Sequence, residues 1–252
     1  MINGLWTAAS GFLKEEKNLD VIANNLANVN TVGYKADRAV FRVVDNSSDK
    51  LRGGGINNLN RNKAINSCAL LDLVYTDLSA GPIEKTGNKL DVVINGEGFF
   101  AVKGSDEIIK YTRDGRFQIN SENKLVTISG EEVQGGGGPI NLEGGEVNID
   151  KEGNIYINGN MSAQLTVVSF EKNELLQKIG DNLYLLPNGA GIEPIPFKGE
   201  VAQGYVEGSN VKVIKEMVGM ITSLRAFETY QKVIQSQMVD TTQRLINETG
   251  KI

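Results

Sequence analysis

Apolar residues near both ends of the chain recur at steps of three and four, the spacing of one stripe along an α-helix. The N-terminal series, in which Glu15 is the one interruption, is Leu5, Ala8, Phe12, Leu19, Ile22, Leu26 and Val29. The C-terminal series, with Gln231 and Thr241 as polar members, is Val213, Met217, Met220, Leu224, Phe227, Ile234, Met238 and Leu245. Both follow a heptad, so we expect a helix at each end of the chain, with matching apolar seams.

Between the two series the period changes to two. Segments such as LDVVING, IIKYTRDGRFQIN and AQLTVVSF alternate β-forming residues between turn residues, which predicts a central β domain. Asp114-Gly115, Asn158-Gly159 and Asn188-Gly189 are two-residue turn signals, because both residue types tolerate positive φ. The stretch from Val44 to Lys63 is rich in Asn, Ser, Arg and Gly, and we expect it to be irregular.

The predicted fold class is therefore α+β, with N- and C-terminal helices and a central all-β domain inserted between them; pairing of the two helices as a coiled coil is implied by the family resemblance given below. The expected divisions are an N-terminal helix at 1–34, an irregular linker at 35–67, the β domain at 68–205 and a C-terminal helix at 206–252. A compact two-layer α+β arrangement is the ordinary alternative for helices flanking one β domain.

Composition limits the classes of function. The chain has 252 residues, 40% of them apolar, which is enough for a sizeable core, and its net charge is -5. No basic tract is present, so we expect no nucleic-acid partner. The start of the chain lacks a cationic and apolar leader, and no apolar run is long enough for a membrane span, so neither a cleaved signal peptide nor membrane insertion is expected. Cys68 is the single cysteine and forms no internal disulfide.

Catalysis is not expected, because the chain has no histidine. Serine and cysteine triads and His-bearing zinc sites are excluded, and no cofactor or metal is predicted. Glu131 and Glu132 do not suit a glycosidase pair, because adjacent strand residues face opposite ways, and the DKEGN context of Asp150 and Glu152 fits a hairpin turn better. The run 135–138 lacks the sequence of a phosphate-binding loop and is interpreted as a flexible β connection.

Aromatic residues of the β segments have two interpretations. They are Phe99, Phe100, Tyr111, Phe117 and Tyr184, and all lie in alternating strand contexts. Such contexts favour core packing over carbohydrate stacking. A secreted glycan-binding β module therefore remains the alternative from another class of function.

An unusual stretch ends the N-terminal helix, because Val21 to Tyr34 carries no charge. Asn24 and Asn28 fall on the helix face opposite Ile22, where Lys and Glu are normal, and Asn25 falls on the flank. Amide side chains suit a buried polar contact with another chain. Helix-end capping, the competing explanation, accounts for Asn30 and Gly33 but poorly for Asn24 and Asn25.

Five motifs in order resemble the bacterial flagellar basal-body rod and hook family. They are NLDVIANNLANVNTVGYK, DVVINGEGFFAV, YTRDGRFQIN, GYVEGSNV and MITSLRAFETYQKVIQSQ, and together they span nearly the whole chain. The resemblance implies a structural axial subunit of the flagellum, with its terminal helices in an inner coiled-coil layer and its β domain in an outer layer. It further implies a rod that transmits motor torque to the hook, and export without a cleaved signal through the flagellar type III apparatus.

Size and local sequence favour a rod protein over the larger hook protein. MINGLW and the stretch through RAVF resemble the distal rod type, whereas the short segment after Phe41 and LRAFETYQKVIQSQ resemble the proximal type, which we favour. The expected partners are other copies, other rod proteins, the export apparatus, and the ring components and peptidoglycan around a periplasm-spanning rod. The expected subunit-interface residues are Ala23, Asn24, Asn25, Leu26, Ala27, Asn28, Gly33, Tyr34, Met220, Leu224, Phe227, Ile234 and Met238.

Overall fold

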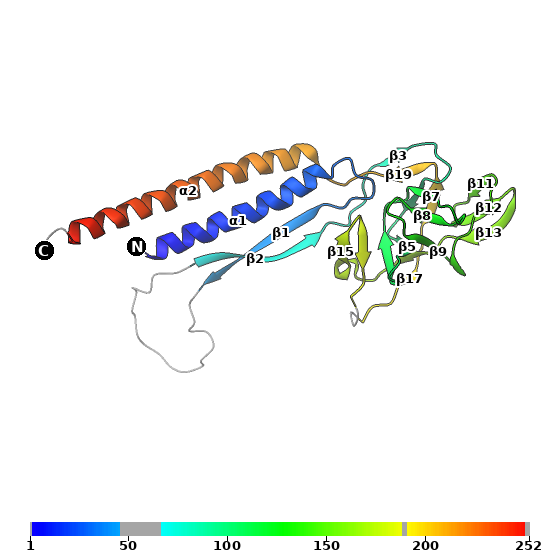
Figure 1. Ribbon diagram of the computed structural model, residues 1–252, viewed down its shortest axis with the longest axis horizontal. Helices are drawn as coiled ribbons and strands as arrows, with labels where there is room; N and C mark the ends of the chain where they lie inside the picture. The colour runs from blue at the N-terminus through cyan, green and yellow to red at the C-terminus, as the bar shows by residue number, and fades with distance from the viewer. Residues whose placement is uncertain (1, 46–66, 188–190, 250–252) are drawn as a thin grey trace. The chain divides into compact units, whose positions relative to one another are not determined.

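The computed structural model describes residues 2–45, 67–187 and 191–249 (Figure 1). The chain forms two compact units, and it crosses between them more than once. The first unit comprises residues 1–26, 37–75 and 213–252, and the second comprises 27–36 and 76–212. The N- and C-terminal helices with a β domain between them confirm the predicted fold class.

The first unit contains the two long helices, α1 (Ile2–Ala27) and α2 (Val213–Thr249). Figure 1 shows them side by side. Phe12 stacks on Phe227 with ring centroids 4.2 Å apart, and Asn18 Nδ2 donates to Ser223 Oγ at 2.7 Å. The contact residue on α2 moves from 227 to 223 as the contact residue on α1 moves from 12 to 18, so the two helices run antiparallel.

The α1 seam faces inward along its length. Ala8 and Ile22 are buried, and the remaining apolar members are half-buried. Glu15, which interrupts the apolar seam, is also buried, and its Oε1 forms an ion pair with Lys14 Nζ at 2.7 Å. The heptad prediction for this helix therefore holds even at its polar member.

The α2 seam divides into two rows. Met220, Phe227 and Ile234, seven residues apart, are half-buried, whereas Met217, Leu224 and Met238 are exposed. Small and polar side chains fill the most buried positions of α2 instead, namely Glu216 and Ser223. The cause is geometric: within one chain, α2 packs on α1 along a single side. The seam position Leu245 lies outside the residues whose side chains are described.

Strands β1 (Asp37–Asp45) and β2 (Ser67–Thr76) pair as a two-stranded sheet in the first unit. The expectation of an irregular linker over 35–67 is therefore wrong for its first part. DRAVFRVV has the β-branched content of a strand, and the sheet packs against α1, where Lys14 Nζ lies 5.5 Å from the Phe41 ring centre. The remainder, 46–66, lies outside the described residues.

The second unit is almost entirely β. Its elements are β3 (Ile83–Lys85), β4 (Val92–Asn95), β5 (Phe99–Lys103), β6 (Ile109–Thr112), β7 (Phe117–Ile119), β8 (Leu125–Thr127), β9 (Glu132–Gly135), β10 (Gly138–Pro139), β11 (Val147–Ile149), β12 (Asn154–Ile157), β13 (Asn160–Gln164), β14 (Val167–Ser169), a short 3-10 helix (Asn173–Leu175), β15 (Gln177–Gly180), β16 (Leu183–Leu185), β17 (Ile195–Pro196), β18 (Glu200–Gln203) and β19 (Tyr205–Glu207). The largest sheet has the order β15-β16-β6-β5-β9-β8-β7. Smaller sheets are β11-β12-β13, β18-β4 and β19-β3, and the strands of each pair run antiparallel.

Two apolar clusters form the core on either side of β5. Alternate residues of a strand face opposite ways, so Phe100 and Val102 enter one cluster while Phe99 and Ala101 enter the other. Tyr111 and Tyr184 join the Phe99 cluster, completing a set of buried aromatic residues. Core packing of the aromatic residues is thereby confirmed.

The predicted turns have mixed outcomes. Asn158-Gly159 joins β12 to β13 with both residues at positive φ, 51° and 86°, as a tight hairpin requires. Asp114-Gly115 is no hairpin, because β6 and β7 do not pair, and Gly115 is needed for another reason: a Cβ there would lie 1.6 Å from Val92 O. Gly135 and Gly138 pair directly in the β9–β10 hairpin. Asn188-Gly189 lies outside the described residues.

Candidate assembly site

The first third of α2 presents an apolar surface away from α1. We call it the outer patch, defined as Ile214, Met217, Val218, Ile221 and Leu224, whose exposure ranges from 43% to 80%. At 100° per residue Ile214, Val218 and Ile221 fall on the side of α2 opposite the buried Glu216 and Ser223, and Met217 and Leu224 fall on the flank between the two sides. Exposure of this many neighbouring large apolar side chains marks an interaction surface rather than ordinary surface variation.

Helix α1 also carries apolar side chains on its outer side. Trp6 is 68% exposed and Leu13 is 56% exposed, although a solvent-facing helix surface normally carries charge. Toward the end of the same helix, Ala23 and Asn24 are exposed.

Asn25 behaves differently from the neighbouring asparagine, because it is fully buried. Its Nδ2 donates to Asp37 O and its Oδ1 accepts from Asp37 N, both at 2.9 Å. The side chain thus imitates a strand partner and fixes the start of β1 against the end of α1. Arg38, the next residue of β1, forms an ion pair with Glu216 at 2.7 Å, which fixes the same strand to the first turn of α2.

Gly33 and Tyr34 are buried inside the second unit. Gly33 has φ of 72°, and a Cβ there would lie 2.5 Å from Asp114 N, so both backbone conformation and space require glycine. The Tyr34 ring packs with Ala36 and Val211 and lies 3.8 Å from Lys178 Nζ. These two members of the expected interface set therefore make contacts within their own chain.

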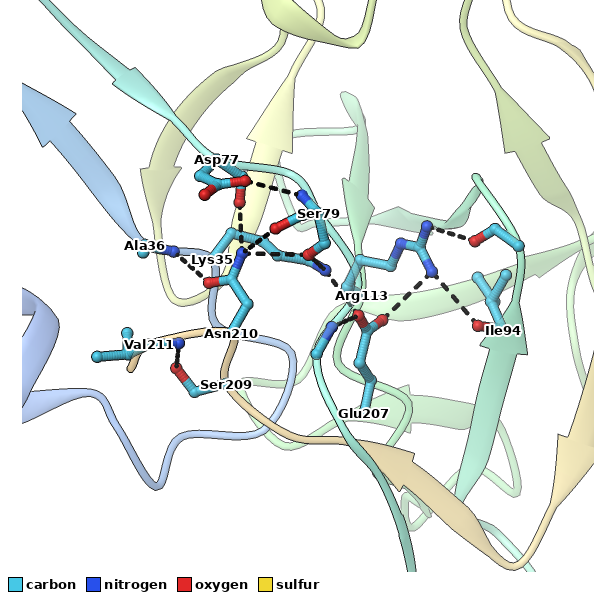
Figure 2. Close-up of polar contacts among 12 residues, drawn as sticks. Lys35, Ala36, Asp77, Ser79, Ile94, Arg113, Glu207, Ser209, Asn210 and Val211 are labelled. Atoms are coloured by element: carbon cyan, nitrogen blue, oxygen red, sulfur yellow. Dashed lines mark hydrogen bonds and ion pairs between the residues drawn. The ribbon is translucent and has the colours of Figure 1, made fainter. Parts of the chain in front are cut away.

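Lys35 lies at the centre of a buried polar cluster (Figure 2). Its Nζ forms an ion pair with Glu207 Oε1 at 2.6 Å and donates to Ser79 O at 2.7 Å. Glu207 Oε1 also accepts from Gly81 N at 2.8 Å. The side chains of Lys35 and Glu207 are 1% and 3% exposed. Burial lowers the pKa of the Lys35 ammonium below its usual value, and the neighbouring carboxylate opposes that shift.

Arg113 approaches the other oxygen of the same carboxylate. Its Nη1 donates to Glu207 Oε2 at 3.2 Å, and its Nη2 donates to Gly96 O at 2.7 Å. Burial lowers the pKa of Arg113 as well, against the opposing charge of Glu207. One carboxylate therefore faces two buried cations. The carbonyl oxygens of Ser79, Ile94 and Gly96 accept further hydrogen bonds from them, whereas the buried Nε of Arg113 has no hydrogen-bond partner among the described residues.

Asn210 completes the cluster from the segment that precedes α2. Its Oδ1 accepts from Ala36 N at 2.8 Å, and its Nδ2 donates to Asp77 O at 2.7 Å and to Ser79 O at 3.1 Å (Figure 2). We call Lys35, Glu207, Arg113 and Asn210 the Lys35 clasp. Sequence reasoning missed all four, although each lies inside one of the quoted motifs. Only Glu207 lies in a strand, β19, so no strand pattern in the sequence marks Lys35, Arg113 or Asn210.

The remaining expected interface residues keep their positions on the helices. Leu224 and Met238 are exposed, Ala27 is exposed, and the half-buried members are Leu26, Asn28, Met220, Phe227 and Ile234. Phe227 contacts Phe12 of its own chain. The set thus separates into side chains used for intrachain packing and side chains that remain accessible.

No group of residues in the described parts of the chain has the composition to hold a metal ion. Among the same residues, no helix combines the length and apolarity of a membrane span.

Three family models match the chain. Residues 5–35 match a flagella basal body rod protein model, residues 93–157 match the D1 domain of the flagellar hook protein FlgE/F/G, and residues 202–245 match the C-terminal model of the flagellar basal body rod FlgEFG proteins. The first and third ranges include Lys35 and the Glu207–Asn210 segment.

Curated relatives agree along the full length. The chain is 33% identical to the flagellar basal-body rod protein FlgG of Buchnera aphidicola (subsp. Acyrthosiphon pisum) over 273 aligned positions, covering 100% of both chains. It is 31% identical to FlgF of Caulobacter vibrioides, covering 100% of both, and 30% identical to FlgG of the same organism, covering 97% and 99%.

A resemblance to the rod and hook family, expected from the motifs, is thereby confirmed. With two paired terminal helices, an inserted β domain and full-length relatives, the chain belongs to the flagellar basal-body rod family, as a structural protein of the basal body and not an enzyme.

Proposed function

We propose that this rod subunit polymerises through the outer sides of α1 and α2, and that the resulting tube acts as a drive shaft carrying motor torque to the hook. The outer patch is the observation that carries the proposal. Its five apolar side chains are exposed in the single chain, and burying them against neighbouring subunits gains roughly 25 cal/mol for each Å² removed from water.

The proposed contact residues are the accessible members of the expected set. On α1 these are Ala23, Asn24 and Ala27, to which we add the half-buried Asn28 just after the helix, and on α2 they are Met238 and the outer patch, which includes Leu224. The other expected residues are not proposed as direct contacts. Contacts within their own chain are made by Asn25, Gly33 and Tyr34. The α2 residues that pack toward α1 are Met220, Phe227 and Ile234.

A position in the proximal rod is the finer part of the proposal, with the distal rod as the alternative. The chain is almost equally similar to the FlgF and FlgG proteins of Caulobacter vibrioides, at 31% and 30% identity. The proximal reading rests on LRAFETYQKVIQSQ in α2 and on the short segment between Phe41 and the β5 motif.

Passage through the flagellar type III export apparatus, without a cleaved signal, also belongs to the proposal. A subunit whose helices expose apolar surface until neighbours arrive is suited to ordering on assembly. Within a periplasm-spanning rod, the other neighbours would be further rod proteins and the ring components around them.

A glycan-binding role loses its structural basis. Phe99, Phe100, Tyr111, Phe117 and Tyr184 are each at most 7% exposed, so none of these rings offers a stacking platform.

The test is Ile221→Asp in the native gene, with Gln235→Asp as a matched change on another exposed part of α2. We expect the Ile221 variant to be secreted and folded but absent from extracted basal bodies, because assembly would bury an unpaired carboxylate. The Gln235 variant should assemble. Electron microscopy of extracted basal bodies shows whether rods are complete. Normal rods containing the Ile221 variant would refute the proposal that the outer patch is an assembly surface.

A further inference from the structure

Two segments of the second unit come from opposite ends of the chain and are tied together. Gly33 N donates to Glu207 O at 2.7 Å, Lys35 Nζ pairs with Glu207 Oε1 at 2.6 Å, and Ala36 N donates to Asn210 Oδ1 at 2.8 Å. Both backbone and side chain take part, so the tie fixes register as well as proximity.

These two segments connect the β unit directly to the two long helices. Residues 28–36 follow α1 directly, and residues 208–212 lead directly into α2. Without the Lys35 clasp, pairing of the helices would close a loop formed by residues 28–212. With the clasp closed, only the short connections on either side of it remain to be ordered. Because closure entropy grows with the logarithm of loop length, shortening the loop raises the effective concentration of one helix for the other by about 10- to 100-fold.

The first unit repeats the arrangement with its own contacts. Asn25 fixes the start of β1 to α1, and Arg38 of β1 pairs with Glu216 in the first turn of α2 at 2.7 Å. The end of α1 and the start of α2 are thus each tied to β1, whose first residue follows Ala36 of the clasped segment.

Burial makes the clasp an all-or-none contact. Lys35, Glu207 and Arg113 are 1%, 3% and 5% exposed at their side chains, and a partly closed clasp would leave at least one of these charges buried without its partner. Open and closed states are therefore favoured over intermediate ones.

We propose that the Lys35 clasp is a positioning device for the helix pair: it holds the end of α1 next to the start of α2, so that the helices pair stably only in chains whose β unit has closed. The proposal concerns the single chain and does not depend on the polymerisation proposed above. Its consequence is an order of events, in which the β unit closes before an assembly-competent helix pair exists.

The test is hydrogen exchange on the dilute, full-length monomer, comparing peptides of α1 and α2 with a peptide of the core strand β5. Asn210→Ala removes the side-chain bonds to Ala36, Asp77 and Ser79 without unpairing a buried charge, and Lys35→Met removes the ion pair with Glu207 and the bond to Ser79. The backbone bonds from Gly33 N to Glu207 O and from Asn210 N to Tyr34 O remain in both variants. Full opening of the clasp would lower helix protection by about 10- to 100-fold by the loop-closure argument, so we expect both helices to lose part of that protection in each variant. In Asn210→Ala, β5 should keep its protection.

Lys178→Met is the matched control. Lys178 Nζ donates to Lys35 O at 2.9 Å, so the variant loosens residues 28–36 but leaves their bonds to Glu207 and Asn210 intact. Its helices should exchange as in the parent. If β5 also loses protection in Lys35→Met, that variant has destabilised the β unit itself, and the comparison then rests on Asn210→Ala. Helix protection unchanged in Asn210→Ala would overturn the proposal, and so would an equal loss in Lys178→Met.

A distance measurement gives an independent reading. Nitroxides at Ala27→Cys and Lys212→Cys, both exposed positions, in a Cys68→Ser background report the separation of the two helix roots. The closed clasp predicts one narrow distance distribution, which Asn210→Ala should broaden. A distribution equally narrow in both chains would contradict the proposed tether.

Discussion

Gly33 shows how one backbone position can require glycine for two separate reasons. Gly87 has nearly the same φ, 75° against 72°, but nothing lies within 4 Å of the Cβ it would acquire. The pair therefore separates the effect of backbone conformation from the effect of close packing.

We predict that Gly87→Ala lowers the free energy of unfolding by about 1 to 2 kcal/mol, the cost of a left-handed alanine. Gly33→Ala should cost at least about 2 kcal/mol more, because its Cβ would meet the backbone of Asp114. Urea unfolding of the full chain measures both. Equal losses would mean that the backbone at 113–114 moves aside.

Neighbouring asparagines of α1 have different roles. We predict that Asn25→Ala destabilises the first unit by about 1 to 3 kcal/mol per lost hydrogen bond, since the half-buried Asp37 backbone loses its partner. Asn24→Ala with Asn28→Ala should leave monomer stability within about 1 kcal/mol, yet stop rod completion. Thermal unfolding and electron microscopy of basal bodies test the two halves. Complete rods from the double variant would reduce Asn24 and Asn28 to helix-end residues.

The two sides of α2 differ in burial. Half-buried Met220, Phe227 and Ile234 pack toward α1, while the outer patch, which includes Leu224, remains accessible. A single heptad in the sequence therefore supplies both packed and accessible side chains, and the accessible ones are those proposed above for assembly.

Aspartate substitutions at adjacent seam positions should separate these sides. Phe227→Asp removes the ring contact with Phe12 and should cost about 3 kcal/mol, seen as lost helical signal in the monomer. Leu224→Asp should keep the monomer's helical signal and abolish association. Circular dichroism and sedimentation measure the two properties. Loss of helix in Leu224→Asp at low concentration would show that this residue, too, serves the intrachain pair.

Across the whole chain, the two units differ from the domains expected from the sequence. The second unit includes residues 27–36, which the expected β domain at 68–205 leaves out together with Glu207 and Asn210. The β unit should therefore need both chain segments of the Lys35 clasp for full stability.

A truncated chain, 27–212, is predicted to unfold at higher urea than 76–212. The expected difference is about 3 to 5 kcal/mol, because removing Lys35 leaves Glu207 with one of its two buried cations. Lys35→Met within 27–212 should reproduce most of that loss. Lys89→Met should not, since the Lys89–Glu146 pair is 60% and 73% exposed. Equal stability of the two truncated chains would remove the clasp's role in the β unit.

Helix period, strand alternation and motif order were sufficient to predict the fold class and the family. They also located the apolar members of the α1 seam on either side of Glu15, and they predicted core packing of the aromatic strand residues. These features depend on local spacing, which a sequence displays directly. The strand β1 was missed because a two-stranded sheet packed on a helix leaves little alternation beside an irregular stretch.

The sequence by itself determined that two amphipathic helices enclose a β domain in a rod-family protein, because amphipathic period and turn chemistry are local properties. Only the tertiary structure decided which seam residues stay accessible, since exposure depends on which side of α2 meets α1. It also decided that Asn25, Gly33 and Tyr34 serve their own chain. The Lys35 clasp joins residues more than half a chain apart, and no periodicity records a contact between a lysine and a glutamate at that separation.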